Sequence, residues 1–268
     1  MRKILKLTTI LTIILFCSSV YVWYDYVAFE KQHFVSPRAA VRVNNNEIKI
    51  GIIGESWAAG RKIDDYLIVA MQDKGVVAYV TSQGHPGAKS KLVYQDLFKP
   101  DIEEYSSNHV LYGEPIDICI VLTGVNDTAS YVGADFYSYH LNLIVSALIT
   151  RGITPLVVEI PEYGIEETDS KSLHGKIRRR LMRLVHDNNQ IDIIPKYRKF
   201  SKQQLMPDIL KEEIIYFPFQ SVSSDYLSDK NLYRDDLLHL NDDGNKKLAL
   251  EISKVIKKWL SNQSTRTQ

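Results

Sequence analysis

This chain of 268 residues has few cysteines and almost no net charge. Only Cys17 and Cys119 are present, so neither a disulfide scaffold nor a cysteine-based zinc site can be built. Lys and Arg total 33 against 32 Asp and Glu, a net charge of +1. Nucleic-acid binding depends on clustered positive charge, and we expect no nucleic-acid partner here. The 45% hydrophobic and 24% charged residues exclude a disordered or fibrous chain and indicate a globular domain.

A basic flank and an uncharged run mark the N-terminus. Residues 1–6 carry Arg2, Lys3 and Lys6, and residues 7–24 carry no charge. Eighteen uncharged residues are at the lower limit for a membrane-spanning helix, and the basic flank predicts that this end stays in the cytoplasm. We therefore expect a signal-anchor at 7–24 and a stalk at 25–46. The alternative is a cleaved signal peptide. Both place the remaining domain outside the cytoplasm, either periplasmic or extracellular, and secreted if the segment is cleaved.

From residue 47 onward, apolar runs of strand length alternate with segments of helical period. This alternation predicts a parallel sheet covered by helices on both faces, within one domain at 47–262 followed by a tail at 263–268. The expected strands are Ile48–Ile53, Val76–Val80, Ile116–Leu122, Ile153–Ile160 and Ile191–Ile194. The clearest expected helices are Phe136–Thr150, Leu173–Asn189 and a last helix from Asn241 to Leu260. Residues 99–114 and 195–231 do not fit the alternation and are interpreted as insertions around a site.

A serine follows the first expected strand, in the sequence Gly54-Glu55-Ser56-Trp57. The carboxyl ends of parallel strands are where α/β proteins place their chemistry. A helix that starts there leaves backbone N–H groups free near Ser56. Ser56 is therefore a candidate nucleophile, although a serine at such a junction is more often only a helix cap.

An acid and a histidine stand close together near the other end of the chain, at Asp236 and His239. A serine nucleophile needs a base that takes its proton, and the base needs an acid that holds its other ring nitrogen. The three-residue offset lets Asp236 turn back onto His239 within one turn. No second His or Cys stands at ligand spacing, which argues against a metal site.

Turns after the second and third expected strands supply possible donors for an oxyanion. Gly87 offers a backbone N–H, Asn126 a side-chain amide, and Ser56 its own backbone N–H. Acyl transfer develops negative charge on an oxygen that such preorganised donors stabilise. Each turn alone is more often plain turn chemistry.

The ordered set of Ser56, Gly87, Asn126 and the Asp236/His239 pair resembles the SGNH hydrolases, also called the GDSL esterase and lipase family. The resemblance covers about residues 47–260. It implies a flavodoxin-like three-layer α/β/α sandwich with a five-stranded parallel sheet. It also implies Ser56 as nucleophile, Asp236 and His239 as its partners, and Ser56, Gly87 and Asn126 as the oxyanion hole. One departure is Glu55, which stands where the family has aspartate.

These observations predict an exported serine esterase that works through an acyl-enzyme, with neither a metal nor an organic cofactor. The expected substrate is an acylated small molecule or glycan, and an O-acetyl group on an envelope or extracellular polysaccharide is favoured. Two alternatives stay open. A sugar O-acyltransferase would use the same residues, and a non-catalytic glycan-binding or assembly protein would retain the site as a relic.

Overall fold

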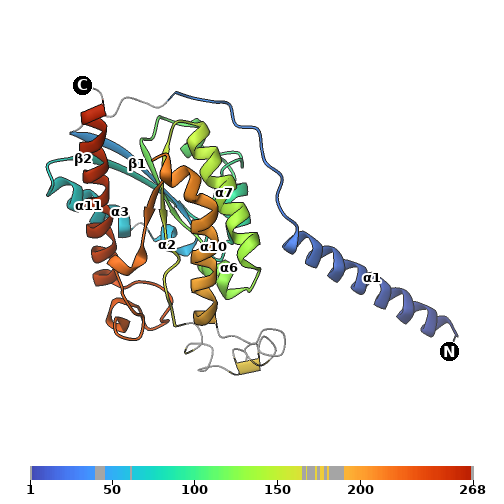
Figure 1. The fold of residues 1–268 in the computed structure, drawn as a ribbon. Coiled ribbons are helices and arrows are strands. Elements are labelled where there is room, and N and C mark those ends of the chain that lie inside the picture. Colours follow the sequence, from blue (N-terminus) through green and yellow to red (C-terminus); the bar gives the residue numbers. More distant parts are fainter. Residues whose placement is uncertain are drawn as a thin grey trace. The chain divides into compact units, whose positions relative to one another are not determined.

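The computed structural model describes residues 2–39, 46–60, 62–164 and 190–266, together with the single residues 167, 173, 176, 177 and 180. The chain forms two compact units, Met1–Lys31 and Gln32–Gln268. Helix α1 (Arg2–Val27) makes up most of the first unit, and the sheet with its helices makes up the second (Figure 1).

The segment expected to span a membrane, residues 7–24, is helical as part of α1. Among the described residues, however, no helix is both long enough and apolar enough to cross a bilayer. Within α1, the Oγ1 of Thr12 and the Oγ of Ser19 donate to backbone carbonyls one turn earlier.

Five parallel strands form the sheet, in the order β2-β1-β3-β4-β5. They are β1 (Glu47–Gly54), β2 (Val77–Gly84), β3 (Ile118–Leu122), β4 (Thr154–Val158) and β5 (Ile215–Phe217). Gly54 pairs with Gly84 on one side and with Leu122 on the other. The carboxyl ends of β2, β1 and β3 therefore lie level, and the loops that follow them start side by side.

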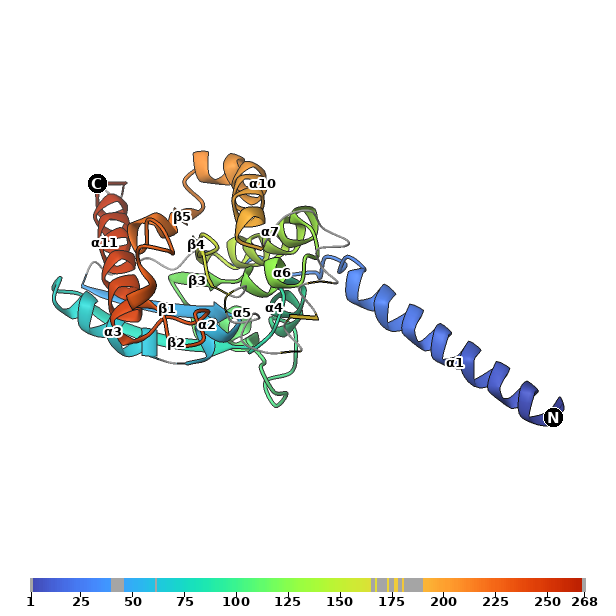
Figure 2. The same cartoon turned by 90° about the horizontal axis from the view of Figure 1, so that it is seen from below.

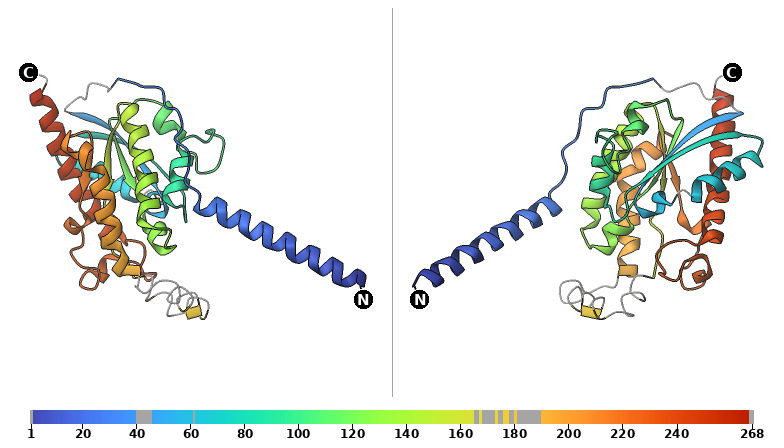
Figure 3. Two further views of the ribbon diagram at one scale, coloured as in Figure 1. Left: turned by 45° about the vertical axis from the view of Figure 1, so that its right-hand side comes forward. Right: turned by 180° about the vertical axis from the view of Figure 1, so that it is seen from behind.

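Helices cover both faces of the sheet, which confirms the predicted three layers (Figure 2). On one face α3 (Lys62–Gln72) packs beside α11 (Asp242–Arg266). On the other lie α4 (Ser90–Asp96), α7 (Ala134–Thr150) and α10 (Gln190–Leu210). The views in Figure 3 show α7 in green alongside α10 in orange. The shorter helices are α2 (Ser56–Ala59), α5 (Asn108–Tyr112) and α6 (Val125–Ala129), and the 3₁₀ helices are η1 (Phe219–Ser221) and η2 (Lys230–Leu232).

The prediction of the fifth strand was wrong. Residues Ile191–Ile194 belong to α10, and the fifth strand is β5, twenty residues further along. A short apolar run cannot be assigned to strand or helix by its own pattern. The residues after this run decide that it is helical, because their buried side chains recur at helical spacing. These are Ile194, Tyr197, Ser201 and Leu205.

Residues 195–231 are consequently not an insertion, because they contain most of α10 and all of β5. The expected helix at Phe136–Thr150 is confirmed as α7, and the last helix starts where expected but continues to Arg266. The expected helix at Leu173–Asn189 lies outside the described residues, apart from isolated positions.

Candidate active site

Glycines allow the elements around Ser56 to approach closely. A Cβ atom on Gly54, the last residue of β1, would lie 1.9 Å from the backbone oxygen of Leu122. A Cβ atom on Gly84, at the end of β2, would lie 2.1 Å from the backbone nitrogen of Ala59 in α2. Since no side chain fits at either position, α2 sits directly on the carboxyl end of the sheet. Ser56 begins this helix and stays partly exposed.

The hydroxyl of Ser56 ends a continuous chain of hydrogen bonds. Its Oγ lies 2.8 Å from Nε2 of His239, and Nδ1 of the same ring lies 2.8 Å from Oδ2 of Asp236. Asp236 is an acceptor when charged, so the Nδ1–H donates to it and leaves Nε2 to accept the Ser56 proton. The structure thus brings Ser56 together with Asp236 and His239, which follow it by 180 and 183 residues in the sequence.

The loop before α11 orients Asp236 and His239. The other carboxylate oxygen of Asp236 accepts the backbone N–H groups of Leu238 and His239, each at 2.9 Å. Leu237, which follows Asp236, adopts a left-handed conformation with φ 57°. Its carbonyl accepts the N–H of Gly164 at 2.7 Å. This tie holds the loop against the segment that follows β4.

Asp236 stays in its charged form. Partial burial acts to raise its pKa, but hydrogen bonds from the backbone and ring of His239 and from the backbone of Leu238 outweigh burial. The pKa of Asp236 is therefore held below its ordinary value. A charged Asp236 is suited to stabilise a positive charge on the neighbouring His239 ring.

The candidate oxyanion donors gather beside Ser56, although they are not equally free. Gly87 has a left-handed φ of 80°, and no hydrogen bond of its N–H occurs within the described residues. The side-chain amide of Asn126 donates to the carbonyl of Ala88 at 3.0 Å and to Oε2 of Glu55 at 2.7 Å. Asn126 therefore joins the Gly87 turn to α6, and both its amide hydrogens are engaged.

Glu55 anchors this region, a role that sequence reasoning missed. Its carboxylate is 1% exposed and accepts the backbone N–H groups of Val125 and Asn126, each at 3.0 Å, besides the Asn126 amide. Burial raises the pKa of Glu55 to about 8 against the opposing effect of these hydrogen bonds. The Glu55 carboxyl thereby lies across the start of α6. In the sequence, the one sign of this anchoring role is that an acidic residue directly follows a buried strand.

A second buried carboxyl, Asp127, ties α6 to α4. It accepts the backbone N–H of Ser90 at 2.9 Å and its hydroxyl at 2.6 Å. Burial raises the pKa of Asp127 to about 6, although the two hydrogen bonds from Ser90 act in the opposite direction. The starts of α4 and α6, which follow β2 and β3, are thereby held together beneath the Gly87 turn.

Other polar groups near the site have structural partners of their own. His85 lies 2.8 Å from Asp96 through Nδ1 and stacks on Tyr105 with ring centroids 4.1 Å apart. Tyr163 is buried, and its hydroxyl lies 2.6 Å from Oγ1 of Thr128 in α6. In the described part of the chain, no group of three or more His, Cys, Asp or Glu side chains is arranged to hold a metal ion.

Neither a protein-family model nor a curated protein matches the sequence. Solved structures do match the fold. The family 3 carbohydrate esterase of Clostridium thermocellum superposes with a TM-score of 0.56 at 15% identity, over 80% of this chain and 98% of that one. The psychrotrophic esterase EstA of Pseudoalteromonas sp. gives 0.54 at 16% identity, over 80% and 98%.

A third match is the GDSL-like lipase of Bacteroides thetaiotaomicron VPI-5482, with a TM-score of 0.51 at 12% identity over 81% of this chain and 92% of that one. Identities this low establish architecture rather than activity. The chain therefore shares the α/β fold of the GDSL and SGNH esterases and lipases, with five parallel strands between two layers of helices.

Proposed function

We propose that this protein is a serine ester hydrolase that works through an acyl-enzyme. The observation that carries the proposal is the chain of hydrogen bonds from Ser56 through His239 to Asp236, with both contacts at 2.8 Å. A nucleophile, a base and an orienting acid in this order form a catalytic triad on any fold.

In the proposed mechanism, each step is carried by a named atom. Nε2 of His239 takes the Ser56 proton while Oγ attacks the ester carbonyl, and the carbonyl oxygen becomes an oxyanion. The backbone N–H groups of Ser56 and Gly87 stabilise that charge, and Asn126 contributes its amide when it releases Ala88 or Glu55. His239 then protonates the leaving alcohol. Water, deprotonated by the same nitrogen, attacks the acyl-enzyme, and His239 returns the proton to the Ser56 oxygen as the acid leaves.

The substrate that we propose carries a small acyl group, favouring acetyl, on a sugar of an envelope or extracellular polysaccharide. One observation supports a small acyl group, and a second supports a carbohydrate as its carrier. Trp57 follows Ser56 directly in the chain and packs edge-on against Phe219 with ring centroids 5.8 Å apart, and we propose that this aromatic pair limits the room for the acyl group. The fold is also shared with a protein described as a carbohydrate esterase.

Export of the domain is part of the proposal. It is supported by the basic residues Arg2, Lys3 and Lys6 ahead of the uncharged stretch 7–24, the order found in export signals. Fractionation of cells that express the full chain tests it, with N-terminal sequencing of the product. Recovery of the unprocessed protein in the cytoplasm alone would contradict export.

The triad is tested by labelling the full chain with a fluorophosphonate, which reacts with an activated serine. We expect labelling of the wild type and none of Ser56→Ala. Turnover of p-nitrophenyl acetate should fall by about three orders of magnitude or more in Ser56→Ala and in His239→Ala, since triad members act as a unit. Ser221→Ala is the matched control, because Ser221 is exposed and bonds only within its own turn.

Full turnover in either triad variant, with an unchanged circular dichroism spectrum, would remove the assignment. An unlabelled wild type would favour the non-catalytic alternative. Product analysis with an added sugar acceptor separates hydrolase from transferase, because a transferase moves the acyl group to the acceptor instead of releasing acetate.

The size of the acyl group is tested with p-nitrophenyl esters of increasing chain length, followed by acetate release from an acetylated polysaccharide such as acetylated xylan. We expect acetate to be the best substrate. In Trp57→Ala, the preference should move toward longer chains because the space beside Ser56 opens. A wild-type preference for octanoate or longer esters would instead indicate a lipase.

A further inference from the structure

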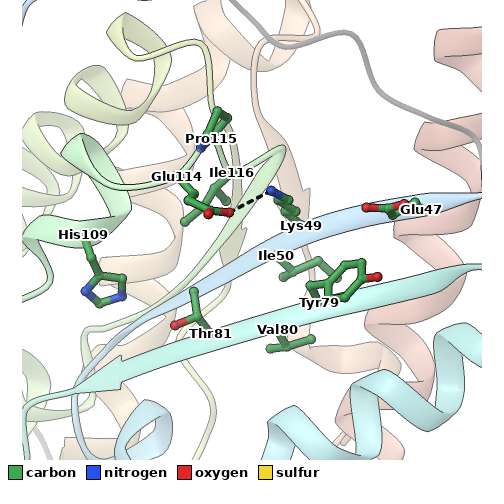
Figure 4. A pocket seen from close by; sticks show the side chains of 10 residues that line it. All are labelled: Glu47, Lys49, Ile50, Tyr79, Val80, Thr81, His109, Glu114, Pro115 and Ile116. Carbon is green, nitrogen blue, oxygen red and sulfur yellow. Dashed lines mark hydrogen bonds and ion pairs between the residues drawn. The ribbon is translucent and has the colours of Figure 1, made fainter.

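A cavity of about 540 Å³ lies apart from the active site, on the sheet face formed by β1 and β2 (Figure 4). It exists because β2 is an edge strand with one face left open. On the opposite face α3 covers β2, and Ser82 bonds to Asp64 there. On the cavity side, Val77 and Tyr79 of β2 are each 55% exposed.

The cavity wall combines an aromatic ring with hydrogen-bonding groups. Tyr79 and Thr81 face it from β2 (Figure 4). Lys49 of β1 reaches across it, and its Nζ lies 2.9 Å from Oε2 of Glu114. Ile116, just before β3, adds an apolar part to the lining. A pocket of this size that mixes apolar surface with a few polar groups is typical of a binding site for a small molecule or a chain segment.

The charge of the lining narrows the ligand class. Glu47 and Glu114 are acidic, Lys49 is basic, and burial lowers the pKa of His109, which favours its neutral form. The lining thus carries one more negative than positive charge, which disfavours phosphate, nucleotide and carboxylate ligands. Three charged side chains along the wall equally disfavour a fatty chain, whose binding would desolvate them. A neutral ligand rich in hydroxyl groups satisfies both conditions.

We infer that this cavity binds a neutral segment of a carbohydrate chain. The Tyr79 ring offers a flat apolar surface for one face of a sugar ring, and Thr81, Lys49 and Glu114 offer donors and acceptors for its hydroxyl groups. This inference rests on the proposed function, because it makes the cavity an anchoring site for the polysaccharide whose ester meets Ser56.

The position of the cavity suits a polymer. Lys49 and Ser56 are seven residues apart along β1 and its end, which corresponds to roughly 20 Å at about 3.3 Å per residue. A polysaccharide is long enough to extend over this distance, whereas a single sugar is not. Simultaneous engagement would raise the local concentration of ester groups near Ser56.

Binding is measured by isothermal titration of the full chain carrying Ser56→Ala, which hydrolyses no ester. The probes are xylohexaose, cellohexaose and chitohexaose. We expect at least one of them to bind. Tyr79→Thr is then added, because threonine suits a strand but lacks the ring. It should raise the Kd of the oligosaccharide that binds by about tenfold, equivalent to about 1.4 kcal/mol. Tyr79→Phe, which retains the ring, should retain binding, and Thr81→Val should weaken it.

Tyr139→Thr is the matched control, because it removes a partly exposed ring from α7, outside the cavity. Thermal unfolding checks that each variant is folded. Binding of none of the three probes would overturn the inference, as would equal binding by Tyr79→Thr. If ATP or laurate binds and Tyr79→Thr abolishes that binding, the cavity takes a nucleotide or a fatty acid and the carbohydrate inference is overturned. A failed fluorophosphonate reaction at Ser56 would instead reject the proposed function. Failure of the cavity inference appears in the binding titration, and failure of the proposed function appears in the labelling experiment.

Discussion

Asn126 is the residue on which several parts of the site converge. Its side-chain amide holds the carbonyl of Ala88 and the carboxyl of Glu55, and its backbone N–H bonds to the same carboxyl. The residue therefore fixes the distance between the Gly87 turn and the start of α6. Both hydrogens of the amide are engaged in these contacts, so Asn126 can donate to an oxyanion at Ser56 only by giving up one of them.

Replacing Asn126 by alanine tests its contribution to the transition state. We expect kcat for p-nitrophenyl acetate to fall by roughly 10²- to 10³-fold with little change in KM, which is the effect of losing one oxyanion donor. Steady-state kinetics measures both constants. An effect confined to KM would make Asn126 a contact for the bound substrate, and no effect on either constant would leave it a purely structural bridge.

At the scale of elements, the close contact between β2 and α2 sets the position of Ser56. Gly84 has no room for a side chain, because an added Cβ would meet backbone atoms of Ala58 and Ala59 at 2.5 Å or less. Backbone cannot rotate aside as a flexible side chain can. A larger residue at 84 must therefore push α2, with Ser56 at its start, away from the end of the sheet.

Gly84→Ala should accordingly lower both stability and turnover. Overpacking of this kind costs about 1 to 3 kcal/mol of unfolding free energy, and displaced Ser56 should lose its hydrogen bond to His239. Denaturant unfolding and ester turnover measure the two effects. Gly60→Ala is the control, because Gly60 has an ordinary φ of −82° and nothing within 4 Å of an added Cβ. A Gly84→Ala variant as stable and active as Gly60→Ala would contradict the argument.

At the scale of the whole molecule, two buried carboxyls link stability to pH. Burial raises the pKa of Glu55 to about 8 from a model-peptide value of 4.5, and that of Asp127 to about 6 from 3.8. The folded state therefore binds more protons than the unfolded state between about pH 4 and pH 8. By linkage, the unfolding free energy contributed by these groups falls as pH rises through that range and levels off above it.

We expect the Tm of the wild type to decline from pH 5 to pH 8. In Glu55→Gln, the decline should be shallower, mostly between pH 6 and pH 8. Glutamine has only one acceptor oxygen, so its NH₂ group faces a backbone N–H and one hydrogen bond is lost. The Tm of this variant should therefore also fall at every pH. Asp127→Asn should flatten the curve mainly below pH 6. A wild-type Tm that rises steadily across this range would show that both carboxyls stay charged in the folded protein.

The sequence alone determined the class of fold, and it singled out the candidate site residues. Alternating apolar strands and helices are local patterns, and they predicted a parallel sheet between helices that the structure confirms. The offset from Asp236 to His239 is also local, so their pairing within one turn could be predicted from three residues of spacing. Ser56 was identified by its place after a buried strand, where an α/β sheet exposes its loops.

Only the tertiary structure decided the contacts made between distant segments. Ser56 meets His239 across 183 residues, and Glu55 meets Asn126 across 71. The sequence carries no local signal for a carboxyl that reaches another loop. The fifth strand was misplaced for the same reason: a run of four residues takes its conformation from what packs against it, and Ile194 packs as part of a 21-residue helix. The cavity over β1 and β2 likewise depends on which sheet face the helices leave open, which is set when the whole chain packs.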